Sequence, residues 1–326
     1  MMNKDAKIYL AGHRGLVGSA LMRQLQAQGY SNIVTRTHAE LDLTNQQLVA
    51  NFFASEKPEY VILAAAKVGG IYANNIYPAE FIQENLAIQS NVIHQSYVGG
   101  VKRLLFLGSS CIYPRDCPQP IKEEYFLTGS LEPTNRPYAL AKIAGIEMCW
   151  SFNRQYGTQY LAVMPTNLYG LGDNYNLENS HVIPAMIRKF HEAKVNDQVT
   201  VTIWGTGTPK REFLYSDDMA EACIFVINLA DEIFKPLLAA DRNDGFPPLL
   251  NLGSGSDISI AELAHLVKKV VGFDGDITLD TTKPDGTMKK LLDSGRLNRL
   301  GWSESTSLLL GLREAYQDFK NQEGLR

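Results

Sequence analysis

Short apolar runs alternate with amphipathic helical patterns through the first half of the chain. The apolar runs have the length of buried strands and cover residues 8–11, 33–35, 60–65, 104–107 and 161–164. The helical patterns between them cover residues 19–28, 46–55, 78–98 and 138–156. Strands that alternate with helices form strand-helix-strand units, in which the strands run parallel. We therefore predict an α/β fold with a doubly wound parallel sheet.

The pattern changes after residue 170, where residues 171–179 have the composition of a loop. A helix is expected from about Val182 or Pro184. A strand over residues 199–204, a loop over 205–209 and a helix over 217–230 should follow. Residues 235–248 are rich in Pro and Asp and are expected to form a surface connector. A strand over 249–252 and a helix over 259–271 then resume the alternation. These changes predict a first domain over residues 1–170 and a smaller C-terminal α/β region over residues 171–326, with residues 212–256 crossing back to the first domain.

Composition and charge exclude several classes of protein. The chain has 326 residues, 45% of them hydrophobic, so it can bury a large core. Its 31 basic and 35 acidic side chains give a formal charge of -4 without a long block of one sign, which argues against nucleic acid as a partner. No run approaches the length of a membrane span, and no long apolar segment follows the first residues. We therefore expect no membrane association and a cytoplasmic protein.

The four cysteines predict no metal site. They include no Cys-x-x-Cys pair, and no His-x-x-x-His spacing accompanies them. Four thiols in a chain of this size suggest a reducing compartment, where most cysteines are small buried hydrophobic residues. Cys117, Cys149 and Cys223 are interpreted in this way.

A glycine-rich turn follows the first expected strand and leads into a helix. It reads Gly12-His13-Arg14-Gly15-Leu16-Val17-Gly18. Glycines at this spacing allow a tight turn, close approach of the backbone to a pyrophosphate, and close packing of a helix whose first N–H groups face the anion. An ordinary turn can also contain three glycines, but the position between a strand and a helix favours a dinucleotide site in a Rossmann-like domain.

The end of the second strand indicates which dinucleotide binds. An acidic residue there accepts hydrogen bonds from the ribose hydroxyls of NAD. Here the segment runs from Val34 to His38 without an acid, and the first acid is Glu40. Arg36, together with Arg14, can instead clamp a 2′-phosphate through bidentate charge-assisted hydrogen bonds. We therefore predict NADP (NADPH) as the cofactor; the alternative is that Arg36 is a solvated charge.

Tyr138 and Lys142 form a Tyr-x-x-x-Lys pair on the helix expected over residues 138–156. Residues four apart share a face of a helix, so a lysine ammonium can favour the phenolate over the phenol. Roughly one free tyrosine in a thousand is ionised at pH 7, and a nearby charge makes the phenol a tunable acid. The same spacing also arises by accident on exposed helices. A second hydroxyl, that of Ser109, follows the expected strand 104–107 at the sheet edge where ligands bind.

Four features together resemble the extended short-chain dehydrogenase/reductase family, whose members mainly act on nucleotide sugars: the glycine turn, Ser109, Tyr138 and Lys142. The resemblance covers nearly the whole chain. It implies that Tyr138 exchanges the carbonyl proton, that Ser109 hydrogen-bonds the same oxygen, and that Lys142 tunes Tyr138 and holds the nicotinamide ribose. It also implies cofactor contacts by His38, Leu41, Leu107, Gly108, Ser110, Pro165, Asn167, Leu168 and His181.

Longer segments are similar to one group within that family, the NADPH-dependent GDP-L-fucose synthases. These segments are residues 11–18, 64–71, 108–114, 165–170 and 179–184. The similarity implies an oxidoreductase that is also an isomerase. Its small-molecule GDP-sugar, GDP-4-keto-6-deoxy-D-mannose, is epimerised at C3 and C5, and the C4 ketone is then reduced. The family also implies a homodimer whose intersubunit helix bundle includes residues 78–98 and 138–156.

Epimerisation beside a ketone requires two proton carriers. A proton leaves one face of the sugar ring, the enolate oxygen is stabilised, and a proton returns to the other face. Cys111 and His181 provide an exchangeable pair, while Ser109 and Tyr138 can hold the enolate oxygen. A free thiol is a few per cent thiolate at pH 7, and a nearby histidine can raise that fraction. The resemblance assigns Cys111 as base and His181 as acid, although each residue taken alone is more often structural.

The segment from Trp204 to Arg211 joins an aromatic face, two glycines and a cation. Arg211 can bind the diphosphate of a sugar nucleotide bidentately. The alternative is a hairpin-like turn with a packed tryptophan. The resemblance implies that Lys189 and Asp285 also contact the nucleotide or the sugar.

The chain departs from the family pattern at two positions, because the resemblance implies arginine where Lys189 and His38 stand. Lysine lacks the planar fork of arginine and grips phosphate less specifically. His38 leaves Arg36 and Arg14 with less help in selecting NADP.

Three alternative activities remain open. A GDP-colitose synthase needs epimerisation only at C5, and no residue separates it securely from the first interpretation. A UDP-hexose 4-epimerase retains NAD and returns the hydride, and Arg36 and Cys111 argue against it. A non-catalytic NADP-sensing module keeps the fold without turnover. The complete catalytic set argues against it, since the chain contains Ser109, Cys111, Tyr138, Lys142 and His181.

Overall fold

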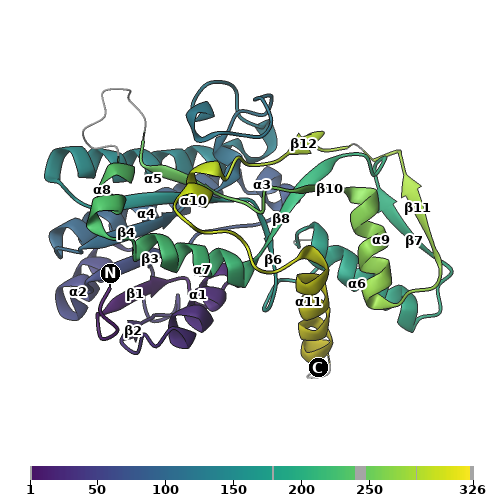
Figure 1. Cartoon of the computed structure of the whole chain (residues 1–326), viewed down its shortest axis with the longest axis horizontal. Coiled ribbons are helices and arrows are strands. Elements are labelled where there is room, and N and C mark those ends of the chain that lie inside the picture. Colours follow the sequence, from purple (N-terminus) through teal and green to yellow (C-terminus); the bar gives the residue numbers. More distant parts are fainter. Residues whose placement is uncertain (1, 178–179, 239–246, 284, 324–326) are drawn as a thin grey trace.

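A six-stranded parallel sheet forms the centre of the molecule (Figure 1). The computed structural model describes residues 2–177, 180–238, 247–283 and 285–323. Every neighbouring pair of strands in the sheet is parallel. The order across the sheet is β2 (Ile33–Val34), β1 (Ile8–Ala11), β3 (Tyr60–Leu63), β4 (Arg103–Leu107), β5 (Tyr160–Pro165) and β9 (Leu249–Leu252). The predicted α/β fold with a doubly wound parallel sheet is confirmed.

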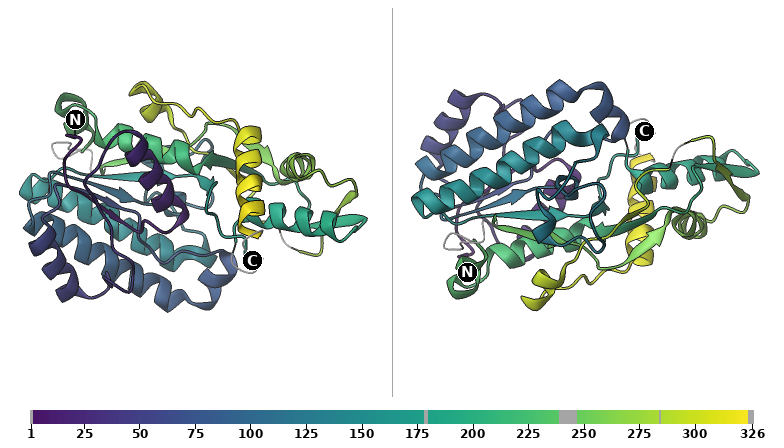
Figure 2. Two further views of the ribbon diagram at one scale, coloured as in Figure 1. Left: turned by 90° about the horizontal axis from the view of Figure 1, so that it is seen from below. Right: turned by 90° about the horizontal axis from the view of Figure 1, so that it is seen from above.

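Helices cover both faces of this sheet, because alternate residues of a strand point to opposite sides. Ile8 and Leu10 belong to the core beneath one helical layer, and Tyr9 and Ala11 to the core beneath the other. The first layer contains α1 (Leu16–Ala27), α7 (Ser216–Ile227), α8 (Asp231–Leu237) and α10 (Gly295–Arg299). The second contains α2 (Gln46–Glu56), α4 (Pro78–Val98) and α5 (Arg136–Tyr156), which lie side by side in Figure 2. Within the described residues, no helix is both long and apolar enough to span a membrane.

A smaller region lies beside the large sheet, at the right of Figure 1. In it, β8 (Lys210–Tyr215) pairs with β6 (Asn167–Tyr169), β10 (Asp257–Ser259) and β12 (Lys289–Lys290), and β7 (Thr200–Trp204) pairs with β11 (Asp276–Asp280). A third core joins these strands to α6 (Val182–Val195), α9 (Ile260–Val271) and α11 (Leu308–Glu323). Between the two regions the chain returns to the large sheet through α7 and β9. The boundary at residue 170 stays a prediction.

The predicted connector over residues 235–248 differs from the structure where it is described. Its first residues continue α8, and Leu238, Pro247 and Pro248 are buried, because apolar side chains at both ends pack against the large sheet. Residues 239–246 lie outside the described part of the chain. The sequence pattern also missed several short elements that mix polar with apolar residues: α3 (Ile71–Ile76), β6, β8, β10, β11, β12 and α10. It missed one long helix as well, α11.

Candidate active site

The glycine turn lies between β1 and α1, and two of its glycines have no room for a side chain. Gly12 has a φ of +88°, and a Cβ there would lie 2.6 Å from the amide nitrogen of Ala65. A Cβ on Gly18 would lie 2.0 Å from the carbonyl oxygen of Gly12. Gly15 has ordinary space, with its nearest contact at 3.7 Å, and stands at the N-cap of α1 without a side-chain cap. The turn therefore presents bare backbone and a helix N-terminus, which suits a pyrophosphate.

Side chains around the turn add polar groups. Leu16 and Val17 begin α1, and Val17 packs on the core beneath it. The Nδ1 atom of His13 is buried and has no hydrogen-bond partner among the described residues. Arg14 is exposed. The turn therefore holds a buried ring nitrogen without a partner among the described residues and an exposed cation.

Arg36 is partly engaged by the protein itself. It donates to the carbonyl of Thr35 at 2.7 Å and to the Glu56 carboxylate at 2.5 Å, and it lies 5.4 Å from the centre of the Phe52 ring. A guanidinium has five N–H donors, so donors remain for a phosphate. The sequence did not reveal Glu56, because it stands twenty positions away on α2.

A neighbouring carboxyl responds to both arginines. Hydrogen bonds from Thr37, and then the cations Arg36 and Arg14, lower the pKa of the Glu40 carboxyl. The 2′-phosphate clamp expected of Arg36 and Arg14 stays a prediction. His38 is exposed, with Nδ1 3.9 Å from Asp42, whereas Leu41 is buried in the core.

Ser109, Tyr138 and Lys142 come together at the carboxyl end of β4. Tyr138 and Ser109 share a hydrogen bond. Lys142 is buried, and its Nζ donates to the carbonyl of Leu107 at 2.8 Å and lies 5.8 Å from the centre of the Tyr138 ring. The three side chains thus gather at the carboxyl end of one strand.

The predicted effect of Lys142 on Tyr138 is wrong for the protein chain by itself. Burial raises the pKa of Tyr138, with Cys111 adding to the rise and Ser109 opposing it. Part of the Tyr138 ring reaches solvent, but the surroundings of its phenolic oxygen are desolvated. Burial also lowers the pKa of Lys142 to about 7. The spacing on the helix correctly predicted a shared face, but burial sets the direction of both pKa shifts.

Cys111 has two partners that the sequence did not indicate. It lies in the 3₁₀ turn Ser110–Ile112, directly after β4, and its N–H donates to the Ser109 hydroxyl at 3.3 Å. Its sulfur accepts from the Nδ2 of Asn135 at 3.2 Å and lies 3.9 Å from the Nζ of Lys290. Lys290 is 179 positions away on β12, and no local pattern connects it with the cysteine.

The other cysteines are enclosed, as predicted for structural residues. Cys149 and Cys223 are fully buried, and burial raises the pKa of each thiol. Cys117 is partly buried, and burial raises its thiol pKa as well.

His181 is the N-cap residue of α6. Its side chain keeps solvent access, yet enough protein surrounds the ring for burial to lower the pKa. Within the described residues no hydrogen bond joins it to Ser109, Cys111 or Tyr138. Its predicted role as a proton carrier therefore stays a prediction.

Residues implied as cofactor contacts lie at the carboxyl ends of β4 and β5 and in β6, which belongs to the smaller sheet. Gly108 packs so closely that a Cβ would lie 2.3 Å from the Cε of Met164. Asn167, the first residue of β6, donates to the carbonyl of Glu212 at 2.8 Å. The remaining members of this set are Leu107, Ser110, Pro165 and Leu168.

An exposed tryptophan with two lysines marks the smaller region. Trp204 is 65% exposed, and the ammonium groups of Lys189 and Lys283 lie 5.3 Å and 5.6 Å from its ring centre. Burial lowers the pKa of Lys189. A flat ring flanked by cations can stack a nucleobase beside phosphates. The sequence analysis missed Lys283, although it precedes Asp285 by only two positions.

Arg211 and Asp285 lie near the same loop. Arg211 donates to the carbonyl of Thr287 at 2.5 Å, and the charge of Asp285 acts on it. Asp285 accepts from the amide and the hydroxyl of Thr206 at 3.0 Å and 2.7 Å. Asp285 therefore holds the loop that follows Trp204 at the end of β7, and its charge acts on Arg211.

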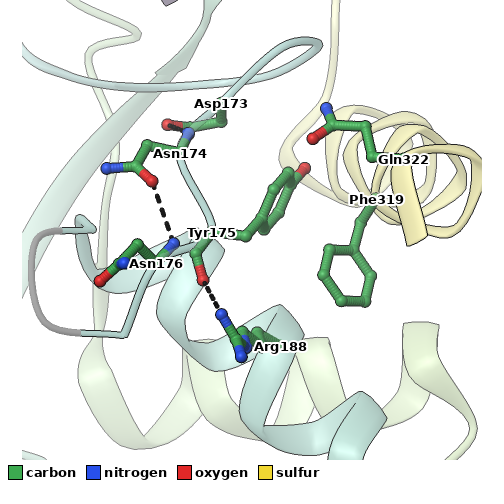
Figure 3. Close-up of a pocket in the computed structure, with 7 residues that line it drawn as sticks. All are labelled: Asp173, Asn174, Tyr175, Asn176, Arg188, Phe319 and Gln322. Atoms are coloured by element: carbon green, nitrogen blue, oxygen red, sulfur yellow. Dashed lines mark hydrogen bonds between the residues drawn. The ribbon is translucent and has the colours of Figure 1, made fainter. Parts of the chain in front are cut away.

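A separate pocket lies between the loop before α6 and helix α11 (Figure 3). Asp173 in this pocket is 8% exposed, and burial raises the pKa of its carboxyl to about 7. Its Oδ1 accepts from the amide of Asn174 at 2.7 Å, whereas Oδ2 has no partner among the described residues. None of the predicted site residues lines this pocket, whose walls are Asp173, Asn174, Tyr175, Asn176, Arg188, Phe319 and Gln322.

A parallel sheet, a glycine turn and a Ser109–Tyr138 pair at the strand ends define a nucleotide-binding α/β enzyme of the epimerase and dehydratase class. The sequence model of the NAD dependent epimerase/dehydratase family matches residues 8–237, and the chain belongs to this family. Among its relatives, GDP-L-fucose synthase 1 from Arabidopsis thaliana is 58% identical over 97% of this chain and 94% of its own length. GDP-L-fucose synthase from Escherichia coli (strain K12) is 52% identical over 98% of each chain. The predicted resemblance to this group is confirmed.

Solved structures agree with the assignment of the chain to this family. A GDP-D-glycero-L-gluco-heptose synthase from Campylobacter jejuni, crystallised in the presence of NADPH, is 40% identical and has a TM-score of 0.91 over 98% of this chain and 100% of its own. Proteins that match two of the alternatives are more distant. The GDP-L-colitose synthase of Yersinia pseudotuberculosis is 36% identical. A UDP-glucose 4-epimerase from Thermotoga maritima is 21% identical and shares the fold alone.

Proposed function

We propose that the chain is an NADPH-dependent enzyme that epimerises GDP-4-keto-6-deoxy-D-mannose at C3 and C5 and reduces its C4 ketone to give GDP-L-fucose. The similarity to two GDP-L-fucose synthases over nearly the whole of each chain carries this proposal. The geometry supports it, because one strand end holds both a carbonyl-directed pair, Ser109 and Tyr138, and a separate proton carrier, Cys111.

The cofactor would rest on the glycine turn and on the arginines beside it. Gly15 leaves the backbone accessible to a pyrophosphate, and Arg14 and Arg36 would hold the 2′-phosphate of NADPH. The unpaired Nδ1 of His13 adds a polar partner. When bound, NADPH supplies the hydride that C4 of the sugar accepts.

Tyr138 would supply the proton for the reduction. Burial raises the pKa of its phenol, so Tyr138 stays protonated and able to donate at neutral pH. Ser109, hydrogen-bonded to Tyr138, would donate to the same C4 oxygen and orient it. Lys142 is buried beside this pair, and burial lowers its pKa to about 7. Small changes in its environment can therefore change its charge at neutral pH.

Cys111 and His181 would move the protons of epimerisation. The Cys111 thiolate removes a proton from C3 or C5, and the C–H electron pair moves into the ring to form an enolate whose charge rests on the C4 oxygen. Ser109 and Tyr138 donate hydrogen bonds to that oxygen. Protonated His181 then returns a proton to the opposite face, which leaves Cys111 neutral and His181 neutral.

The GDP part of the substrate would bind across the smaller region. Trp204 offers an exposed ring for the guanine, and Lys189 and Arg211 offer cations for the diphosphate. Lys283 lies over the same ring and belongs to this proposed set. Asp285 supports the loop that carries Trp204.

A direct assay tests the proposed function. Purified protein is mixed with NADPH and GDP-4-keto-6-deoxy-D-mannose in deuterated water, and the loss of NADPH absorbance and the product spectrum are recorded. The proposal expects GDP-L-fucose with deuterium at C3 and C5. Deuterium at C5 alone would indicate the C5-only epimerase of the colitose type, and the absence of turnover would reject the assignment.

We also propose a homodimer that acts in the cytoplasm. Free cysteines fit a reducing compartment. The outer faces of α4 and α5 expose Tyr97, Val98, Leu140 and Tyr156, which is an apolar surface suited to a second copy of the chain. Light scattering coupled to gel filtration tests the assembly, and a monomeric mass would reject it.

A further inference from the structure

We propose that Lys290 and Asn135 form a seat for the thiolate of Cys111, which makes this cysteine the base for epimerisation. The inference rests on the proposed function and names two positioning residues for it. Neither residue lies in the segments 11–18, 64–71, 108–114, 165–170 and 179–184 that carry the resemblance. Both reach the cysteine only through the tertiary fold.

The seat consists of two hydrogen-bond donors that point at the Cys111 sulfur. The amide Nδ2 of Asn135 lies 3.2 Å from the Cys111 sulfur, and the Nζ of Lys290 lies 3.9 Å from it. An ammonium has three donors and no acceptor, so it cannot accept a proton from a thiol. Two donors that converge on one sulfur match a thiolate better than a neutral S–H group.

The backbone around Lys290 is held firmly, so the ammonium approaches from a defined direction. The amide of Leu291 donates to the Oε1 of Gln119 at 2.9 Å, and the amide of Leu292 donates to the Oε2 of Glu212 at 2.9 Å. The carbonyl of Leu291 accepts from the amide of Ile121 at 2.7 Å. The bonds with Gln119 and Ile121 attach the chain just after β12 to the segment that follows Cys111, and the bond with Glu212 attaches it to β8.

Asn135 is equally well placed. It ends the 3₁₀ turn Pro133–Asn135 and precedes α5, the helix that carries Tyr138. Its Oδ1 is buried and has no hydrogen-bond partner among the described residues. One end of the amide therefore contacts the sulfur, while the other end stays without a partner among the described residues.

The other charged groups near the sulfur do not compete with Lys290. Tyr138 feels the charge of Cys111, and its own pKa is raised, so the phenol stays neutral. Lys142 is turned toward the carbonyl of Leu107. Asp116 acts on Cys117, whose thiol also feels Lys290. Among the described residues, Lys290 and Asn135 are therefore the side-chain donors that contact the Cys111 sulfur.

The test is the pH dependence of Cys111 alkylation, measured without substrate. Iodoacetamide is added between pH 5.5 and pH 9, and modification of the Cys111 peptide is followed by mass spectrometry, which separates it from Cys117. Loss of a charge at hydrogen-bond range is worth about tenfold in the thiolate fraction, so Lys290→Gln should react about tenfold more slowly than the wild type near pH 7. Lys290→Arg should restore most of the rate. Asn135→Asp places a negative charge beside the sulfur and should slow the reaction as well.

The matched control is Lys289→Gln, because Lys289 is the neighbouring lysine of β12 and pairs with Asp257 at 3.1 Å. It should leave the alkylation profile unchanged. Thermal melting and NADPH binding of each variant verify the fold. Superimposable profiles for the wild type and a folded Lys290→Gln would overturn the proposal. Alkylation is measured without turnover, so its result does not depend on the GDP-sugar assay. A failure of that assay alone would reject the proposed function, while the alkylation rates would still test the contact of Lys290 with Cys111.

Discussion

The ammonium of Lys142 lies 5.8 Å from the centre of the Tyr138 ring and donates its hydrogen bond to the carbonyl of Leu107. The two residues share a face of α5, one turn apart, as their spacing predicts. The hydrogen-bond partner of Lys142, however, is the carbonyl of the last residue of β4 and not the Tyr138 hydroxyl. Burial moves both groups toward their neutral forms, since it raises the pKa of Tyr138 and lowers that of Lys142 to about 7. In the protein chain itself, Tyr138 is therefore a protonated acid.

This arrangement predicts that Tyr138→Phe abolishes the proton donor of the reduction and leaves the cofactor site intact. NADPH oxidation with the GDP-sugar should fall by roughly 10²- to 10⁴-fold, the usual contribution of a general acid. NADPH binding, followed by fluorescence, should remain close to that of the wild type. Tyr156→Phe, at the exposed end of the same helix, is the control. A Tyr138→Phe enzyme with normal turnover would exclude the phenol as proton donor.

The glycine turn predicts different outcomes for two neighbouring substitutions. Gly18→Ala forces a Cβ to within 2.0 Å of the Gly12 carbonyl oxygen, so α1 must shift and the protein should melt several degrees lower. Gly15→Ala meets only an ordinary contact at 3.7 Å, so the melting temperature should change little. The methyl group then intrudes where a pyrophosphate would approach, and NADPH affinity should fall. Equal destabilisation by both substitutions would contradict this division of roles.

Arg36 predicts the preference for NADPH over NADH. Charge-assisted hydrogen bonds are worth about 1.5–3 kcal/mol, so Arg36→Ala should raise the KM for NADPH roughly 10- to 100-fold and change the KM for NADH little. Glu56→Gln removes the carboxylate that engages Arg36 at 2.5 Å and should lower the KM for NADPH. Steady-state kinetics with both cofactors measure these effects. If Arg36→Ala weakened both cofactors equally, Arg36 would not recognise the 2′-phosphate.

Asp173 predicts a pH-dependent stability. Its folded-state pKa is about 7 instead of 3.8, because the carboxyl is buried. The folded protein therefore binds a proton that the unfolded chain releases between about pH 4 and pH 7, and stability falls as the pH rises through this window. Asp173→Asn cannot ionise, so it should exceed the wild type in free energy of unfolding at pH 8, by at most about 4 kcal/mol, and differ less at pH 5. Urea unfolding at both pH values tests this, and an equal difference at both would show that Asp173 does not titrate in this range.

Local spacing was sufficient to predict the fold and much of the candidate site. The helix Pro78–Val98 and the strand Leu249–Leu252 have the predicted bounds. The strand was recognisable as a short, almost continuous apolar run, which is typical of a strand buried on both faces. The glycine turn was recognisable because Gly12 and Gly18 are only six residues apart and neither tolerates a Cβ. Short strands such as β6 and β12 carry too few residues to show a period.

By itself, the sequence determined the parallel sheet, the nucleotide turn and the identities of Ser109, Tyr138 and Cys111 as reactive candidates, because each depends on neighbours within a few positions. Only the tertiary structure decided what surrounds them. It brought Lys290 from 179 positions away to the sulfur of Cys111 and placed Glu56 against Arg36. It also made the pKa of Tyr138 rise, where the sequence had predicted a fall. Desolvation depends on how many atoms pack around a group, and the period of a helix carries no information about that number.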